Sequence, residues 1–328
     1  NIEIKIISNK QTLEENFMIE TVVSSELSVD ESLIIKKNRL ISEKKDDNMK
    51  RICIVTGIHG DELEGQYVCY ELMRIINEKI ENLHGVVDIY PTLNPLGIDS
   101  VHRGMPTFDL DMNRIFPGSE NGAMAEYMAA KVIDDIKGAD MCIDLHASNI
   151  FLKEAPQVRI SEETKEKLLP YAKLINTDFI WIYPEKKVNQ STLVYNLNKI
   201  NVPTIMVEMG VGMRITKEYC FDLVNGILNL MKELGIWDGD TTVVKNPIIA
   251  NNDQVTFVNS NSSGIFIPCV DHWKGIKKGD VMGEIIDVLH GEVLERVISP
   301  CNGMIFTLRE YPVVYEGSLI ARIVGEGF

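Results

Sequence analysis

The stretch ICIVTGIHGDE, residues 52–62, joins an apolar, β-branched run to a histidine and a glutamate three residues apart. Two later runs also end in polar residues: Asp144-Leu145-His146 follows Met141–Ile143, and Glu208 follows Thr204–Val207. Ligands of an open α/β sheet bind outside the carboxyl ends of its strands. The three stretches are therefore predicted to converge on one crevice.

Strands and helices alternate along most of the chain. The pattern predicts strands at 2–7, 32–37, 51–57, 86–90, 141–145, 179–183 and 204–208, and helices at 64–79, 123–137, 162–175, 192–199 and 217–234. Such alternation indicates an α/β fold with a largely parallel sheet covered by helices on both faces.

The composition and periodicity of the sequence change after Trp237. Residues 240–328 are rich in Val, Ile and Gly, show little helical periodicity, and contain turn-like segments at 275–283 and 299–303. A chain of 328 residues exceeds what one core usually fills. We expect a large domain at 1–238 and a small all-β domain at 239–328, packed together because no low-complexity linker separates them.

Composition narrows the class of protein. A formal net charge of −15 argues against nucleic acid or an anionic membrane as the main partner, and no apolar run is long enough to cross a bilayer. The six cysteines are scattered singly with no Cys-x-x-Cys pair, which predicts neither a disulfide framework nor a cysteine-based zinc site. This cysteine usage fits a reducing compartment best, so we expect a cytoplasmic protein; the first ten residues also show no secretory pattern.

Three residues form a candidate metal site. A catalytic zinc needs three protein ligands and one open position. His59 and Glu62, three apart on a turn that enters a helix, would lie side by side, and His146 is the third candidate. Asp144 points the same way along its strand and is placed to orient an imidazole. The alternative is that each histidine is a satisfied polar group at a strand end.

Glu208 is the candidate base. It ends the apolar strand 204–207, where an ionised carboxylate is costly unless it serves a purpose. Zinc acidifies water, and a nearby carboxylate can take up the proton and pass it to a leaving amine. Gly210 and Gly212 are expected to leave room for a substrate. The alternative for Glu208 is an ordinary ion pair at a sheet edge.

A long connection at 91–122 carries further candidates. Structureless connections of about thirty residues are usually functional. Arg103 and the Asn113-Arg114 pair in this connection are suited to stabilising an oxyanion and clamping a substrate carboxylate. Arg159 and Arg214 are weaker candidates, because an isolated loop arginine is often only solvated.

Together with Asn94-Pro95 and the segment DMNRIFPG at 111–118, these motifs resemble the succinylglutamate desuccinylase/aspartoacylase family of the zinc carboxypeptidase superfamily. The resemblance covers roughly residues 50–235. It implies an α/β/α sandwich with a mixed sheet and one Zn²⁺ per chain. The implied roles are zinc binding by His59, Glu62 and His146; general base and then acid for Glu208; carbonyl polarisation by Arg103; and substrate binding by Asn113, Arg114 and Arg214.

The C-terminal segment is similar to the barrel-sandwich domains of lipoyl carriers, through residues 277–280 and 299–305. The position of a modified lysine is not evident there. The resemblance therefore implies a shielding or oligomerisation role for this domain rather than acyl carriage.

The leading hypothesis is a zinc hydrolase that cleaves the amide bond of a small, carboxylate-bearing N-acyl amino acid. A metallocarboxypeptidase that acts on peptides is the runner-up, with Tyr183 or Tyr195 as its downstream tyrosine. A binding protein with a purely structural zinc is the third alternative, against which the presence of Glu208 argues. A homo-oligomer is compatible with all three.

Overall fold

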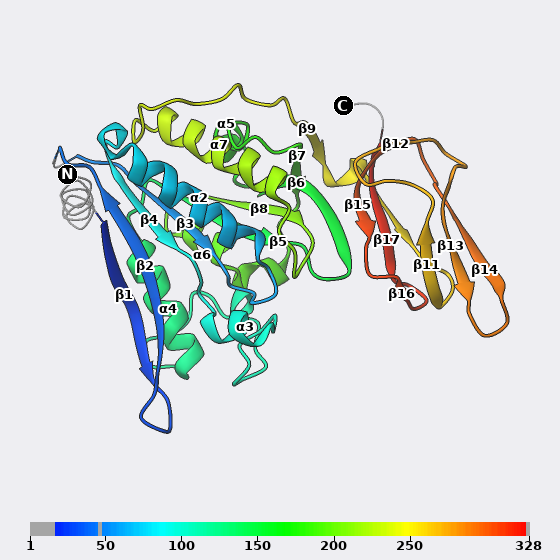
Figure 1. Cartoon of the computed structure of the whole chain (residues 1–328), viewed down its shortest axis with the longest axis horizontal. Helices are drawn as coiled ribbons and strands as arrows, with labels where there is room; N and C mark the ends of the chain where they lie inside the picture. Colours follow the sequence, from blue (N-terminus) through cyan, green and yellow to red (C-terminus); the bar gives the residue numbers. More distant parts are fainter. Residues whose placement is uncertain (1–16, 45–47, 326–328) are drawn as a thin grey trace, which may run out of the picture.

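The computed structural model describes residues 17–44 and 48–325 (Figure 1). The strand expected at 2–7 lies outside these ranges. A large mixed sheet runs through the molecule with the strand order β1-β2-β4-β3-β5-β8-β6-β15-β17-β10, and a second, four-stranded sheet lies at the C-terminal end. The architecture is the predicted one: an α/β/α sandwich whose central strands are mostly parallel, followed by an antiparallel β part.

The parallel centre of the sheet consists of β4 (Val86–Tyr90), β3 (Arg51–Thr56), β5 (Met141–Ala147) and β8 (Thr204–Gly210). An antiparallel hairpin of β1 (Phe17–Glu26) and β2 (Ser32–Ile41) extends it beside β4. The strand expected at 32–37 is therefore present and continues farther, to Ile41.

Alternate residues of β3 face opposite helical layers, as a period of two requires. Ile52 and Ile54 belong to the core beneath α2 (Glu64–Glu78) and α7 (Lys217–Glu233). Cys53 and Val55 belong to the core beneath α4 (Met124–Ile136) and α6 (Leu193–Lys199). These four helices agree with the predicted ranges to within one residue at each end. Because β3 is buried on both faces, its sequence is an unbroken apolar run.

The strand β6 (Leu152–Ser161) was not predicted, and the sequence analysis was wrong to leave this segment without one. It pairs antiparallel with β8 and parallel with β7 (Phe179–Tyr183). Polar residues interrupt its apolar pattern, yet Glu154 and Gln157 are buried and hydrogen-bonded to each other. The helix expected at 162–175 is shorter, α5 (Lys165–Ala172).

The connection at 91–122 has structure of its own. It contains α3 (Pro95–Ser100), whose N-terminus is capped by the Asn94 side chain, and the 3₁₀ turn η2 (Met112–Arg114). Met105, Met112 and Phe116 of this connection are buried in the core on the α4 side. Apolar anchors therefore hold the polar residues of the connection in place against the sheet. The remaining 3₁₀ turns are η1 (Ile80–Asn82) and η3 (Lys187–Ser191).

The C-terminal segment is built of short strands. They are β9 (Ile248–Asn251), β10 (Val255–Asn259), β11 (Gly264–Pro268), β12 (Gly275–Ile276), β13 (Val281–Asp287), β14 (Glu292–Ile298), β15 (Gly303–Arg309), β16 (Val313–Val314) and β17 (Leu319–Gly325), with the 3₁₀ turn η4 (Asn252–Gln254). Residues of both sheets share one core here, as in a sandwich. Because β15 pairs with β6 and β9 pairs with β7, the main sheet continues into this segment.

The structure locates the cysteines and allows the helices to be checked for length and apolar character. All six cysteines are free, and Cys53 and Cys142 are buried in strands. In the part of the chain that the structure describes, none of the helices combines the length and apolar character needed to span a bilayer.

The glycines after β8 do not leave room for a substrate, contrary to expectation. A Cβ atom on Gly210 would lie 2.0 Å from Oε1 of the buried Glu64, and one on Gly212 would lie 2.8 Å from the backbone nitrogen of Ile150. Gly210 also has a φ of +67°. The space beside both glycines is filled by protein.

Replacing Gly210 by alanine is therefore expected to destabilise the fold. The left-handed backbone and the displaced Glu64 carboxylate should together lower the free energy of unfolding by at least about 2 kcal/mol in urea denaturation. Gly275→Ala is the control, because the nearest atom to its Cβ would be 4.0 Å away. Equal stability of the two variants would contradict the conclusion that protein atoms fill the space beside Gly210.

Candidate metal centre and its cavity

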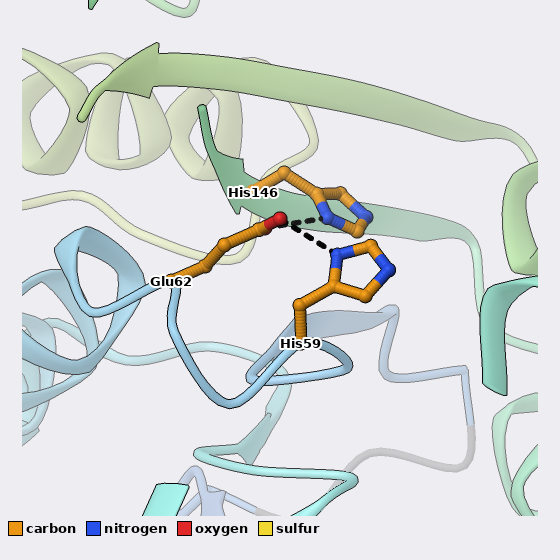
Figure 2. Close-up of side chains that lie close together, drawn as sticks. All are labelled: His59, Glu62 and His146. Atoms are coloured by element: carbon orange, nitrogen blue, oxygen red, sulfur yellow. Dashed lines mark hydrogen bonds and ion pairs between the residues drawn. The ribbon is translucent and has the colours of Figure 1, made fainter. Parts of the chain in front are cut away.

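His59, Glu62 and His146 meet at one point (Figure 2). The Glu62 carboxylate lies between the imidazoles, with Oε1 2.7 Å from His59 Nδ1 and Oε2 2.9 Å from His146 Nδ1. One ligand atom from each residue lies within 4.8 Å of the others, and all three side chains are buried. The three residues that the sequence singled out as ligands are thus brought together.

Two separate elements supply the three side chains. His59 and Glu62 lie in the turn between β3 and α2, and His146 lies in the neighbouring parallel strand β5. Gly57, with a φ of +64°, turns the chain sharply after β3, and its carbonyl accepts hydrogen bonds from the backbone nitrogens of Leu93 and Asn94. The 91–122 connection therefore fixes the turn that carries two of the candidate ligands.

The Nε2 atom of each imidazole, on the side away from Glu62, contacts a further carboxylate. His146 Nε2 lies 3.1 Å from Asp144 Oδ2, and His59 Nε2 lies 3.0 Å from Asp111 Oδ1. An Nε2–H that donates to a carboxylate leaves the Nδ1 lone pair free to face a cation. The structure places Asp144 where an orienting group was expected. The sequence analysis assigned no role to Asp111, although it opens the 111–118 segment and caps η2.

The charges around Glu62 reinforce one another. Burial by itself would raise the pKa of Glu62, but His59 and His146 lower it. Burial likewise disfavours the charged form of His146, yet Asp144 and Glu62 raise its pKa well above the usual value. For Asp111, burial is outweighed by the hydrogen bond from His59, and the pKa falls to about 2.

This donor set fits a divalent cation. A bound cation would take the place of protons on the two Nδ1 atoms, whose lone pairs would then face it together with the oxygens of Glu62. The carboxylates of Glu62, Asp111 and Asp144 surround the two imidazoles. Arg103 Nη1 donates to Glu62 Oε1 at 2.7 Å, and the charge of Arg114 also acts on Asp111. Two nitrogens and one carboxylate are a common ligand set of catalytic zinc.

A cavity of about 450 Å³ opens above these three residues. Arg103, Asn113, Arg114 and Glu208 all line it, whereas Arg214 is exposed and is not among its lining residues. Asn113 Oδ1 accepts a hydrogen bond from the backbone of Leu193, and Arg114 donates to the Asn113 carbonyl. These contacts fix the backbone and side chain of the pair at the wall of the cavity.

Glu208 lies on the wall formed by β8. Its Oε2 is 3.0 Å from Nη1 of Arg159, which also lines the cavity. Burial raises the pKa of Glu208 and Arg159 opposes this shift. Arg159, a weaker candidate from sequence, therefore contacts the candidate base directly. No sequence signal linked these two residues, because the strand that carries Arg159 was itself not predicted.

The family is shown by comparison of sequences. The Succinylglutamate desuccinylase/Aspartoacylase catalytic domain matches residues 48–234, more than half of the chain. The protein therefore belongs to the succinylglutamate desuccinylase/aspartoacylase family, as the sequence motifs predicted. Proteins of this family are amide-hydrolysing deacylases.

The individual proteins to which the chain is similar share low sequence identity with it. An N-alpha-acetyl-L-2,4-diaminobutyric acid deacetylase of Halomonas elongata is 26% identical over 279 residues, which are 81% of this chain and 80% of the relative. A succinylglutamate desuccinylase/aspartoacylase structure from Rhodobacter sphaeroides has a TM-score of 0.78 at 20% identity, covering 94% of this chain and 96% of that one. The product-bound ectoine utilization protein EutE (DoeB) from Ruegeria pomeroyi has a TM-score of 0.79 at 19% identity, covering 93% and 94%. These two likenesses show the fold.

Replacing Asp111 by asparagine is expected to weaken metal binding. The amide cannot hold the His59 imidazole as a carboxylate does, and loss of such an orienting group typically lowers metal affinity by about 10–100-fold. Competition with a zinc chelator measures the change. Asp109→Asn, in the same connection, is the control, because the Asp109 side chain is 93% exposed. Unchanged affinity in Asp111→Asn would exclude the orienting role.

Proposed function

We propose that the protein is a zinc-dependent deacylase that hydrolyses the amide bond of a small N-acyl amino acid. The observation that carries the proposal is the buried trio His59, Glu62 and His146 at a cavity whose wall presents Glu208. A deacylase family and a donor set that fits zinc support the same reading.

His59, Glu62 and His146 would hold the zinc ion. Bound there, zinc would supply Lewis-acid activation of water and of the scissile carbonyl. Glu208 accepts a proton from the attacking water and then returns it to the nitrogen of the leaving amine, so that the carboxylate is restored at the end of the cycle. The raised pKa of Glu208, which burial causes, favours its role as proton acceptor.

Arg103 is placed to stabilise the negative charge that develops on the carbonyl oxygen. One of its nitrogens is held by Glu62, and its side chain is still 43% exposed at the cavity. A guanidinium fixed in this manner offers further N–H donors without reorganising during the reaction. Burial opposes the charged form, but Glu62 raises the pKa of Arg103, which keeps it cationic.

Asn113 and Arg114 would bind the substrate carboxylate. The side-chain Oδ1 of Asn113 accepts a hydrogen bond from the backbone nitrogen of Leu193, which leaves the side-chain NH₂ as a donor. Arg114 is anchored through one nitrogen to the Asn113 backbone and is otherwise exposed at the cavity. An amide and a guanidinium side by side suit a carboxylate. We do not extend the proposal to Arg214, which lies outside the cavity lining.

Glu208→Gln should abolish most of the activity while zinc is retained. The amide keeps the shape of the side chain but cannot accept the proton, so kcat is expected to fall at least about 100-fold. Steady-state kinetics and metal analysis on the same preparation provide the measurement. Glu163→Gln, a change outside this cavity's lining, is the control. Full turnover in Glu208→Gln would remove this residue from the mechanism.

The substrate class can be tested by a panel of N-acyl amino acids against peptides with free and blocked C-termini. Because one relative is named a deacetylase of N-alpha-acetyl-L-2,4-diaminobutyric acid, N-acetyl amino acids come first. We expect hydrolysis of acyl amino acids that a chelator stops and added zinc restores. Faster cleavage of free-ended peptides would instead indicate a carboxypeptidase, for which Tyr183 at the cavity would be the tyrosine of interest.

A further inference from the structure

The strand β6 places three polar side chains on one face beside the cavity. Gln157 and Arg159, two residues apart, share a face because of the period of the strand. Glu154 would point to the other face, but the register with β8 shifts between Glu154 and Gln157. Such a bulge re-aims a side chain. The hydrogen bond from Gln157 Nε2 to Glu154 Oε2, at 2.8 Å, shows that the two side chains meet.

Arg159 uses all three of its nitrogens in this setting. Nη1 lies 3.0 Å from Glu208 Oε2, Nη2 donates to Glu154 Oε1 at 3.3 Å, and Nε donates to Gln157 Oε1 at 3.1 Å. Its guanidinium also lies over the Trp181 ring, 5.3 Å from the centroid. Among the described residues, Arg159 is the only basic side chain within ion-pair distance of Glu208.

Two C-terminal strands contact Glu154, the residue to which Arg159 Nη2 donates. Glu154 Oε1 accepts a hydrogen bond from Arg322 Nη1 of β17 at 2.6 Å, and Oε2 accepts one from Thr307 Oγ1 of β15 at 2.6 Å. Arg322 lies over the Trp181 ring from its own strand, 5.6 Å from the centroid. Glu154 and Thr307 are buried, so these bonds are shielded from water.

We propose that Arg159 is a positioning residue for Glu208, and that β15 and β17 hold Arg159 in place through Glu154. The proposal rests on the function proposed above, because it assigns Glu208 a role as base. It gives the C-terminal β segment a part in catalysis that needs neither acyl carriage nor oligomerisation.

Arg159 would position Glu208 both by fixing its side-chain geometry and by balancing its charge. A glutamate side chain at a cavity wall has several rotamers, and a fixed partner on Oε2 selects one and leaves Oε1 for the proton. The carboxylates of Glu208 and Glu154 are balanced by the guanidiniums of Arg159 and Arg322, so the buried cluster carries no net charge. Without Arg322, Glu154 would draw Arg159 away from Glu208. The C-terminal strands therefore determine how firmly the base is held.

The test uses the full-length, zinc-loaded protein and three single variants. Arg159→Met should lower kcat about 100-fold with little change in KM, which is the cost of misplacing a catalytic group. Arg159→Lys should recover about tenfold of that loss, because it restores the charge but not the planar fork. Arg322→Met should lower kcat by a smaller factor, again with KM unchanged.

Arg309→Met is the matched control. Arg309 lies on β15 and donates to the backbone carbonyls of Tyr311 and Val313, away from the cavity lining. It should lower the melting temperature without changing kcat. If Arg159→Met likewise lowered only the melting temperature, the role of Arg159 would be structural and the proposal would be overturned.

A double-mutant cycle separates positioning from substrate binding. If Arg159 acts through Glu208, the double variant Arg159→Met with Glu208→Gln should be no slower than Glu208→Gln alone. Multiplicative losses, or a raised KM in Arg159→Met, would show that Arg159 contacts the substrate itself and would overturn the proposal.

The same double-mutant cycle, measured by melting temperature, distinguishes failure of the positioning proposal from failure of the proposed function. If the wild-type protein hydrolysed none of the acyl amino acids, the proposed function would fail while this cycle could still be measured. Arg159→Met should lower the melting temperature more in the wild-type background than in Glu208→Gln, because only the former is left with an unpaired carboxylate. Equal shifts in both backgrounds would overturn the pairing of Arg159 with Glu208.

Discussion

The Glu62 carboxylate, buried between two imidazoles, is the interaction on which the site depends. Leaving an ionised carboxylate in a protein interior without partners costs about 3–5 kcal/mol. Glu62 avoids that cost through His59, His146, Arg103 and the backbone nitrogen of Ala147, which lies 3.1 Å from Oε2. These partners come from a turn, a strand and a long connection. The fold must therefore assemble all three before the carboxylate is stable where it lies.

The charge of the cavity wall differs from the charge of the protein as a whole, which bears on the anionic substrate proposed above. The net charge of −15 repels anions at long range. The cavity, however, is lined by the four basic side chains Arg103, Arg114, Arg159 and Lys186, against only two carboxylates, Glu62 and Glu208. Within about 10 Å, the screening length at moderate salt, these local charges outweigh the distant ones. Attraction of a carboxylate-bearing molecule thus depends on the cavity wall.

The sequence predicted those features that depend on local pattern. His59, Glu62 and His146 each follow an apolar strand, and the carboxyl ends of parallel strands lie at one edge, so their meeting could be inferred. The strand β6 could not, because its polar residues are buried through partners far along the chain, such as Thr307 and Arg322. Asp111 was missed for a similar reason: its partner His59 is 52 residues away.

The position of β6 is one reason why the sheet is mixed; the antiparallel hairpin of β1 and β2 is another. A parallel strand beside β8 would require a crossover connection, whereas β6 follows β5 after a short turn and runs back along β8. One edge of β6 pairs with β8, where Gln157 lies opposite Glu208, and the other edge pairs with β15 at residues 152–154 and with β7 at residues 157–161. Main-chain hydrogen bonds thus connect the strand that carries Glu208 to the C-terminal segment through a single intervening strand. A substitution in β15 or β17 can therefore reach the cavity without any change in the turn after β3 or in β5, which carry the candidate metal ligands.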